Sequence, residues 1–152
     1  MTVPKLSETS LFEFAKSLLS SGGALAHEAD VVARSLVEAN IRGHDSHGVM
    51  RIPFYIAAVQ RAAIHPGAKL TIERETPGVL VCDGGWGFGQ VLSRDLMDRL
   101  MAKAADAGIA CGTLRQSAHI GRLGEYAEMA AARNMCAIVC ANTHGAGQRV
   151  AP

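Results

Sequence analysis

The first third of the chain carries apolar residues at the spacing of amphipathic helices. In its first segment, the apolar positions are Leu11, Phe14, Leu18 and Leu19. Because residues three and four apart lie on one face of a helix, this spacing predicts a helix that begins after Ser7 or Thr9 and ends near Leu19. The same spacing predicts a second helix over about residues 27–41 and a third over 52–63.

After residue 64 the pattern changes to short apolar runs that alternate with amphipathic stretches. The expected strands are 69–73, 78–83, 108–114 and 135–141, and the expected helices are 90–108 and 124–134. Such alternation is typical of α/β proteins whose sheet is at least partly parallel. The sequence therefore predicts an α/β fold in which N-terminal helices precede an alternating strand–helix sheet. We expect a helical segment over 1–64 and an α/β segment over 65–152.

The composition fits a folded globular protein and narrows the range of partners. The chain is 49% hydrophobic and 19% charged, with a formal net charge of +1. Since no basic stripe or acidic tail stands out, we expect neither nucleic acid nor a membrane surface as a partner. No apolar run approaches the roughly 20 residues of a membrane-spanning helix, and residues 1–16 lack the apolar core of a signal peptide. We therefore expect a cytoplasmic protein.

The four cysteines form no CxxC pair, and three of them lie inside apolar runs. They are Cys82, Cys111, Cys136 and Cys140. A reduced cysteine behaves as a small hydrophobic residue and is commonly buried. We therefore expect four reduced thiols in the core.

The segment GGWGFGQ, residues 84–90, lies between a predicted strand and a predicted helix, where dinucleotide-binding loops occur. Its glycines follow the pattern GGxGxG rather than GxGxxG, and no acidic residue ends the next strand. These features exclude a Rossmann nucleotide site. A tight glycine turn that leads into the helix is the favoured interpretation, and close approach of this backbone to a cofactor or partner is the alternative.

The polar stretch RGHDSHGVMR, residues 42–51, could hold a metal ion through His44, Asp45 and His47. A zinc site needs three or four ligands at regular spacing, and neither HxxxH nor HExxH is present. We therefore expect no metal.

Another interpretation of the same stretch depends on helical spacing. His47, Arg51 and Tyr55 are four residues apart, so a helix that begins near Gly48 would align them on one face, with Ser46 beside them. Such a face offers a guanidinium that matches a carboxylate, an imidazole and hydroxyl donors. The alternative is a solvated helix face with a buried histidine paired to an aspartate. The spacing favours neither.

Three loops follow predicted strands: 84–90, 115–121 and 141–148. If those strands are parallel neighbours, the loops share one edge of the sheet, where α/β proteins bind ligands. His119 in the second loop is either a general acid/base or a capping histidine. Asn142 and Thr143 in the third loop could contact a ribose, phosphate or amide. Together they predict a polar site at this edge.

Four segments carry a family resemblance: RGHDSHGVMRIPFY, VCDGGWGFGQ, SAHIGRLGEYAEMAA and CANTHGAGQRVAP. They resemble the malate/L-lactate dehydrogenase family, which is distinct from the Rossmann-type lactate and malate dehydrogenases. The resemblance covers nearly the whole chain and implies a non-Rossmann α/β fold. Members of the family are considerably longer, so the chain resembles their amino-terminal half, and we expect it to be incomplete at its C-terminus.

The resemblance also implies an activity and a set of site residues. It implies interconversion of a 2-hydroxy acid and a 2-oxo acid with NAD or NADP, in a homodimer whose active site lies near the subunit interface. By position, His119 matches the proton-transferring histidine of the family. The other matched residues are Ser46 and His47 beside nicotinamide and substrate, Arg51 and Tyr55 near the substrate carboxylate, and Thr143 with neighbouring Asn142 at the cofactor.

Two hypotheses follow for the function of the chain. In the first, the chain belongs to an oxidoreductase that transfers a hydride between NAD(P) and a small 2-hydroxy or 2-oxo acid. In the second, it is a truncated, non-catalytic homologue that only folds or dimerises. Since part of the cofactor site would be missing, we expect the 152-residue chain alone to leave the absorbance of NADH or NADPH unchanged.

Overall fold

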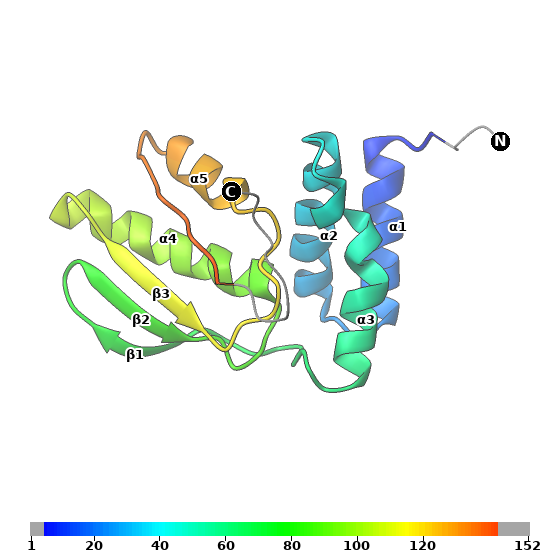
Figure 1. The fold of residues 1–152 in the computed structure, drawn as a ribbon, viewed down its shortest axis with the longest axis horizontal. Coiled ribbons are helices and arrows are strands. Elements are labelled where there is room, and N and C mark those ends of the chain that lie inside the picture. The colour runs from blue at the N-terminus through cyan, green and yellow to red at the C-terminus, as the bar shows by residue number, and fades with distance from the viewer. Residues whose placement is uncertain (1–4, 143–152) are drawn as a thin grey trace.

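The computed structural model describes residues 5–142, which form a layer of helices followed by a small α/β unit. The helical layer contains α1 (Glu8–Ser21), α2 (Ala26–Ile41) and α3 (Ile52–Gln60), with two short 3₁₀ turns, η1 (Asp45–His47) and η2 (Val49–Arg51), between α2 and α3. Figure 1 shows the three helices packed side by side at one end of the molecule. The three N-terminal helices expected from the apolar spacing are confirmed, although α3 ends at Gln60 rather than near residue 63.

Local hydrogen bonds explain where the first two helices begin. Ser7 Oγ accepts a hydrogen bond from the main-chain N–H of Ser10 at 3.1 Å and so caps α1. Before α2, the buried carboxylate of Glu28 accepts from the N–H of Leu25 at 3.0 Å. Its second oxygen accepts from the N–H of Gly67 at 2.7 Å. Glu28 therefore also anchors the connection from α3 to the sheet.

The sheet has three strands in the order β1–β2–β3. Its elements are β1 (Thr71–Glu75), β2 (Val79–Asp83) and β3 (Cys111–Arg115), with α4 (Gly89–Ala107) between β2 and β3 and α5 (Gly124–Ala131) after β3. β1 pairs antiparallel to β2, whereas β2 pairs parallel to β3. A parallel pair needs a long crossover, and α4 supplies it. The prediction of an α/β fold with a partly parallel sheet is confirmed.

The strand expected over 135–141 does not form. These residues take no part in a hydrogen-bonded strand within the described range 5–142, and their exposure alternates between intermediate and exposed. Ile138 is 95% exposed. A continuous apolar run makes a strand only where a neighbouring strand completes its hydrogen bonds, and none of the described residues does so here. The prediction of a strand over 135–141 is wrong.

The prediction of four buried thiols is also mostly wrong. All four cysteines are free, but only Cys82 is buried, whereas Cys111, Cys136 and Cys140 are exposed. Cys82 faces α4 from β2, because alternate residues of a strand point to opposite faces. Cys111 belongs to β3, and Cys136 and Cys140 belong to the unpaired segment after α5. Their apolar neighbours in the sequence therefore do not indicate burial.

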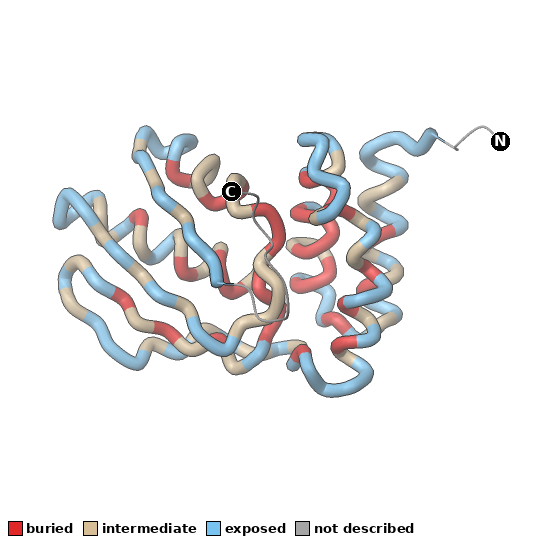
Figure 2. Tube along the Cα trace, in the orientation of Figure 1, coloured by how far each residue is buried: buried red, intermediate tan, exposed pale blue. Residues whose placement is uncertain are grey.

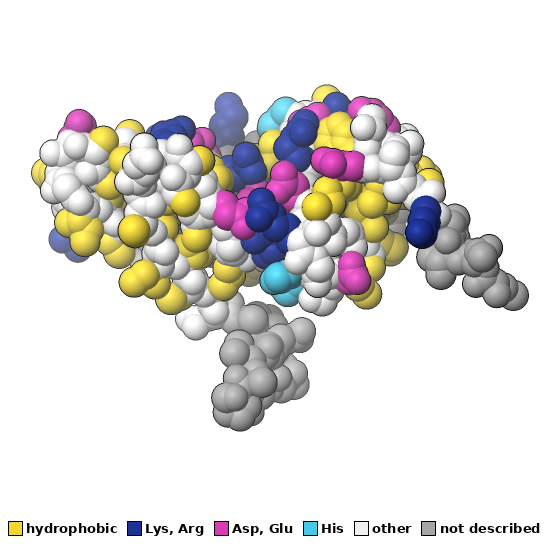
Figure 3. All heavy atoms as spheres, turned by 90° about the horizontal axis from the view of Figure 1, so that it is seen from above, with side chains coloured by type: hydrophobic (Ala, Val, Ile, Leu, Met, Phe, Trp, Pro, Cys, Tyr) yellow, Lys and Arg dark blue, Asp and Glu magenta, His cyan; other side chains and the backbone are white. Residues whose placement is uncertain are grey.

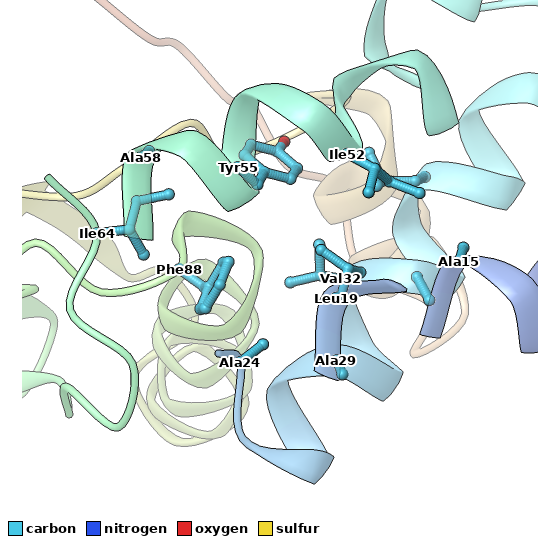
Figure 4. Close-up of a cluster of buried hydrophobic side chains, with 12 residues drawn as sticks. Ala15, Leu19, Ala24, Ala29, Val32, Ile52, Tyr55, Ala58, Ile64 and Phe88 are labelled. Atoms are coloured by element: carbon cyan, nitrogen blue, oxygen red, sulfur yellow. The ribbon is translucent and has the colours of Figure 1, made fainter. Parts of the chain in front are cut away.

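Two hydrophobic clusters hold the structure together. The larger one joins α1, α2 and α3 and takes in Phe88, which immediately precedes α4 (Figure 4). The smaller one lies between the sheet and α4 and contains Leu80, Cys82 and Leu96. Figure 2 shows that the buried positions concentrate in α2 and where α4 and the loop after β3 approach the helices. At about 1.5–3 kcal/mol for each large apolar side chain, these clusters supply most of the driving force for folding.

A buried hydrogen bond and a surface ion pair also connect the helices to the α/β unit. Glu125 on α5 is buried; it accepts from Ser35 Oγ of α2 at 2.5 Å and from Arg94 of α4 at 2.5 Å. Arg42, at the end of α2, lies 3.3 Å from Glu128 of α5. Figure 3, which views the molecule from above, shows acidic and basic side chains interspersed in the middle of that face. The helical layer and the α/β unit are therefore in close contact. The division into segments 1–64 and 65–152 stays a prediction from the sequence.

Neither a membrane-spanning helix nor a metal cluster is found in the part of the chain that the structure describes. No helix within residues 5–142 is both long and apolar enough to cross a membrane. No group of three or more potential metal-ligating side chains comes together among these residues.

Candidate active site

The polar stretch after α2 forms a corner that the Asn40 side chain holds in place. Asn40 accepts from the N–H of Val49 at 2.9 Å and donates to Asp45 at 2.6 Å. A Cβ atom at Gly48 would overlap the Asn40 amide, so the corner needs glycine at this position. Asp45 is therefore engaged in supporting the backbone and pairs with no histidine in the described residues. The expected helix from near Gly48 is wrong: η1 and η2 precede α3, which begins at Ile52.

His119 lies in the loop after β3, and α4 supports this loop from behind. A Cβ atom at Gly89, the first residue of α4, would collide with the main chain of Ala118 and His119. The loops after β2 and β3 are also hydrogen-bonded to one another, with Gly84 N donating to Arg115 O at 2.9 Å. These two loops therefore share one sheet edge, as parallel pairing of β2 and β3 requires.

The two regions meet at the imidazole of His119. Tyr55 Oη of α3 lies 2.7 Å from His119 Nδ1, and Gln90 Nε2 of α4 donates to Tyr55 Oη at 2.8 Å. The ring centroids of His47 and His119 are 5.4 Å apart. Tyr55 is only 1% exposed, and its ring also packs edge-on against Phe88. Tyr55 therefore lies in the hydrophobic core (Figure 4), in contact with His119, and not on a solvated helix face.

Arg51 adjoins this cluster and keeps part of its guanidinium available. Its Nε donates to the main-chain oxygen of Ser46 at 2.6 Å, and Ser46 Oγ lies 2.9 Å from His47 Nδ1. In residues 5–142, no acidic side chain forms an ion pair with Arg51. Since a guanidinium offers two parallel donors to a carboxylate, Arg51 is suited to bind an acid.

The surroundings of the cluster keep both histidines neutral. Burial lowers the pKa of His119 to about 4; the positive charge of Arg51, and that of His47 where it is protonated at acidic pH, contribute to the decrease. Burial, followed by the charges of Arg51 and His44, also lowers the pKa of His47. Burial raises the pKa of Tyr55 to about 12, which keeps its hydroxyl protonated. At neutral pH the site therefore contains two neutral imidazoles and one cation.

This low pKa predicts how stability depends on pH. In the unfolded chain His119 becomes protonated as the pH falls below its ordinary pKa of 6.5. In the folded chain it stays neutral until about pH 4. The stability from this residue is complete above pH 6.5 and is lost as the pH falls through that window. The full loss would be about 3 kcal/mol, and partial exposure of the ring reduces it to about 1–2 kcal/mol.

The variant His119→Asn isolates this contribution, because asparagine keeps an acceptor for Tyr55 but does not titrate. Urea unfolding at about pH 7 and about pH 4.5 should show the unaltered chain losing about 1–2 kcal/mol more than the variant. Equal losses of unfolding free energy in the two proteins would contradict the assignment of a His119 with a lowered pKa.

The two residues expected at the cofactor are not among these contacts. Asn142 is exposed in the segment after α5, and Thr143 lies outside the described residues. Sequence reasoning missed Gln90 and Gly121, which both contact the cluster: Gly121 N donates to His119 Nδ1 at 3.3 Å. A signal for Gln90 was present, because it is a polar residue at the start of a predicted helix, directly after the glycine loop 84–89.

The fold and the cluster define an α/β protein with a histidine–arginine site where its helical layer meets the sheet edge. A family model described as malate/L-lactate dehydrogenase matches residues 6–152, and the chain belongs to this family.

Individual relatives give the same result. The L-sulfolactate dehydrogenase of Methanocaldococcus jannaschii is 33% identical over 85% of this chain and 38% of its own length. The L-lactate dehydrogenase of Cupriavidus necator is 33% identical over 97% of this chain and 42% of its own length. The solved structure of malate dehydrogenase from Pyrococcus horikoshii matches 86% of this chain and 37% of that protein, with a TM-score of 0.83 and 35% identity. The chain thus spans about two fifths of the length of these relatives.

Proposed function

We propose that the chain carries the substrate-binding and proton-transfer residues of an NAD- or NADP-dependent dehydrogenase that interconverts 2-hydroxy and 2-oxo acids. The observation that carries this proposal is the position of His119. Its Nδ1 is held by Tyr55, its ring lies against His47, and its Nε2 makes no hydrogen bond to any described residue. The names of the relatives, which include malate, lactate and sulfolactate dehydrogenases, support the substrate class.

Each side chain of the cluster has a role in the proposed reaction. Arg51 binds the substrate carboxylate and so fixes the orientation of the adjacent C2 atom. In the oxidation direction, Nε2 of His119 accepts the hydroxyl proton; in the reduction direction, it returns a proton to the carbonyl oxygen. Ser46 and His47 are hydrogen-bonded to each other at 2.9 Å, and the pair donates one hydrogen bond to the reacting oxygen. Tyr55 turns its hydroxyl toward His119, so we assign it to holding that ring rather than to contacting the carboxylate.

The family resemblance implies that Asn142 and Thr143 contact the cofactor. Asn142 is exposed, and its amide can both donate to and accept from a carboxamide or a ribose hydroxyl. When bound, the nicotinamide supplies or accepts the hydride, and the protein contributes orientation and a proton acceptor.

A homodimer is part of the proposal, and a groove between α1 and α3 supports it. The groove encloses about 630 Å³ and is lined almost entirely by apolar side chains, Phe14 and Met50 among them. These two are 58% and 67% exposed, and Met50 directly precedes Arg51. Apolar patches of this kind commonly mark protein interfaces. Analytical ultracentrifugation should show that the unaltered chain is a dimer and that the variant Phe14→Glu is a monomer. If the unaltered chain is a monomer, the assignment of this groove as the dimer interface is contradicted.

We also propose a cytoplasmic location. The support is that all four cysteines, each of which lies within the described residues, are free thiols. Unpaired thiols are typical of reducing compartments.

Ligand binding distinguishes the proposed dehydrogenase from a module that only folds or dimerises. Pyruvate and oxaloacetate are added to the isotopically labelled 152-residue chain, with acetate as the control that lacks the 2-oxo group. The dehydrogenase proposal expects the imidazole signals of His47 and His119 to move with the 2-oxo acids and much less with acetate. Imidazole signals that do not shift with any of the three acids would favour the non-catalytic module.

An assay of turnover completes the test. The natural polypeptide that contains these residues is mixed with NADH or NADPH and the same acids. We expect the absorbance of the reduced nicotinamide to fall with at least one 2-oxo acid. An unchanged absorbance with every acid and both cofactors would contradict the proposed activity.

A further inference from the structure

The side chain of Gln90 is buried beside the site, and only one end of its amide has a partner. Gln90 is 0% exposed, and its Nε2 donates to Tyr55 Oη at 2.8 Å. Its Oε1 is buried and accepts no hydrogen bond from the residues that the structure describes. Buried polar atoms are rarely left unpaired, so this oxygen calls for a physical explanation.

The present hydrogen bonds fix the tautomer of His119. The N–H of Gly121 donates to Nδ1 at 3.3 Å, so Nδ1 is an acceptor and the hydroxyl of Tyr55 also donates to it, at 2.7 Å. The chain of donors therefore runs from Gln90 to Tyr55 to His119. A neutral His119 in this arrangement carries its hydrogen on Nε2, the nitrogen that faces the proposed substrate.

Proton exchange at Nε2 needs the opposite arrangement. An imidazole that accepts a proton at Nε2 must already carry its hydrogen on Nδ1, and it keeps that hydrogen when Nε2 gives the proton back. Nδ1–H must then donate to Tyr55 Oη, so Nδ1 no longer accepts from Tyr55 or from the N–H of Gly121. The hydroxyl hydrogen of Tyr55 then needs another acceptor. A half-turn of the Gln90 amide places Oε1 where Nε2 now lies, 2.8 Å from Tyr55 Oη.

We propose that Gln90 is a positioning residue for His119. Its amide turns so that Oε1 accepts the Tyr55 hydroxyl hydrogen whenever His119 carries a hydrogen on Nδ1, and Nε2 donates to Tyr55 when it does not. The role in turnover rests on the proposed function, because proton exchange at Nε2 is what demands the turned state. The coupling of Gln90 to His119 through Tyr55 is a property of the folded chain and can be measured without turnover.

The test has to separate this coupling from charge acting through space. His47 and Arg51 act on His119 from the corner after α2, and the charge of Glu125 on α5 acts on Tyr55. A carboxylate at position 90 can accept but not donate, so Gln90→Glu forces the turned state. Gln90→Glu also adds a negative charge that acts directly on His119. This direct effect remains in Tyr55→Phe, which lacks the hydroxyl that links residue 90 to His119, so the Tyr55→Phe background measures it separately.

The pKa of His119 is measured by ¹⁵N NMR titration in the 152-residue chain with and without these substitutions. We expect Gln90→Glu to raise the proton affinity of His119 about tenfold or more and to move its neutral form toward the Nδ1–H tautomer. In the Tyr55→Phe background, the same substitution should change the affinity about twofold or less. A rise of equal size in both backgrounds, or no rise in either, would overturn the proposal.

A second variant keeps the proposal testable if Gln90→Glu does not fold. Gln90→Met is close in volume but offers no acceptor, so it should lower kcat of the natural polypeptide about tenfold while changing KM about twofold or less. Ser93→Ala, which removes another buried polar group from α4, serves as the control and should leave kcat unchanged. An unchanged kcat in Gln90→Met would contradict the role of Gln90.

The two proposals fail in different ways. If the Gln90→Glu effect depends on Tyr55 but no 2-oxo acid is turned over, the positioning of His119 stands and the proposed function is wrong. If turnover depends on His119 but the effect of Gln90→Glu does not depend on Tyr55, the function stands and the role of Gln90 is wrong.

Discussion

Replacing His119 with asparagine is expected to lower kcat for 2-oxo acid reduction by a factor of about 10²–10⁴, the usual contribution of a general acid or base. Asparagine keeps an acceptor near Tyr55 Oη and Gly121 N, so the loop should keep its shape while the proton-exchanging Nε2 is lost. The affinity for NADH or NADPH should change little, because His119 is proposed to act on the substrate oxygen. The measurement is steady-state kinetics of the natural polypeptide that contains residues 1–152.

The matched control is His27→Asn, which changes an exposed histidine at the start of α2. This variant should keep the kcat of the unaltered protein. If His119→Asn lowers kcat no more than His27→Asn does, His119 is not the proton-transferring residue.

The second large effect is expected at Arg51. Arg51→Gln removes the cation proposed to bind the substrate carboxylate, and a lost charged hydrogen bond is worth about 1.5–3 kcal/mol. KM for the 2-oxo acid should therefore rise by a factor of about 10–150. Arg51→Lys should recover only part of this loss, because an ammonium cannot form the paired hydrogen bonds of a guanidinium.

Arg51 also allows a measurement that does not depend on activity. Its positive charge contributes to the low pKa of His119, so Arg51→Gln should raise that pKa. Arg61→Gln is the control, since Arg61 is exposed and lies over the ring of Phe54. A KM that stays the same in Arg51→Gln would show that the substrate carboxylate binds elsewhere.

The order of the elements could be predicted because each rests on local spacing. The apolar positions of α1 and α2 recur at helical intervals, and the runs that form β2 and β3 flank the long amphipathic stretch of α4. The failures are of another kind. Residues 135–141 have a strand-like pattern, yet a strand also requires a partner, which the local sequence does not specify.

The site could be predicted in its residue types but not in its contacts. His119 was expected at a polar site because it follows a strand whose neighbour runs parallel. The contact between Tyr55 and His119 joins residues 64 positions apart, and that between Tyr55 and Gln90 joins residues 35 apart. No periodic pattern encodes such pairs. The helical spacing of His47, Arg51 and Tyr55 did not decide between a functional face and a solvated one, and the burial of Tyr55 on α3 excludes the solvated face for this residue.

A crystal structure of the natural polypeptide with oxamate, an unreactive analogue of a 2-oxo acid, tests the central claim most directly. Oxamate should place its carboxylate on the guanidinium of Arg51 and its amide oxygen within hydrogen-bond distance of His119 Nε2, beside His47. A structure in which oxamate binds elsewhere, and contacts neither Arg51 nor His119, would contradict the claim that these residues form one substrate site.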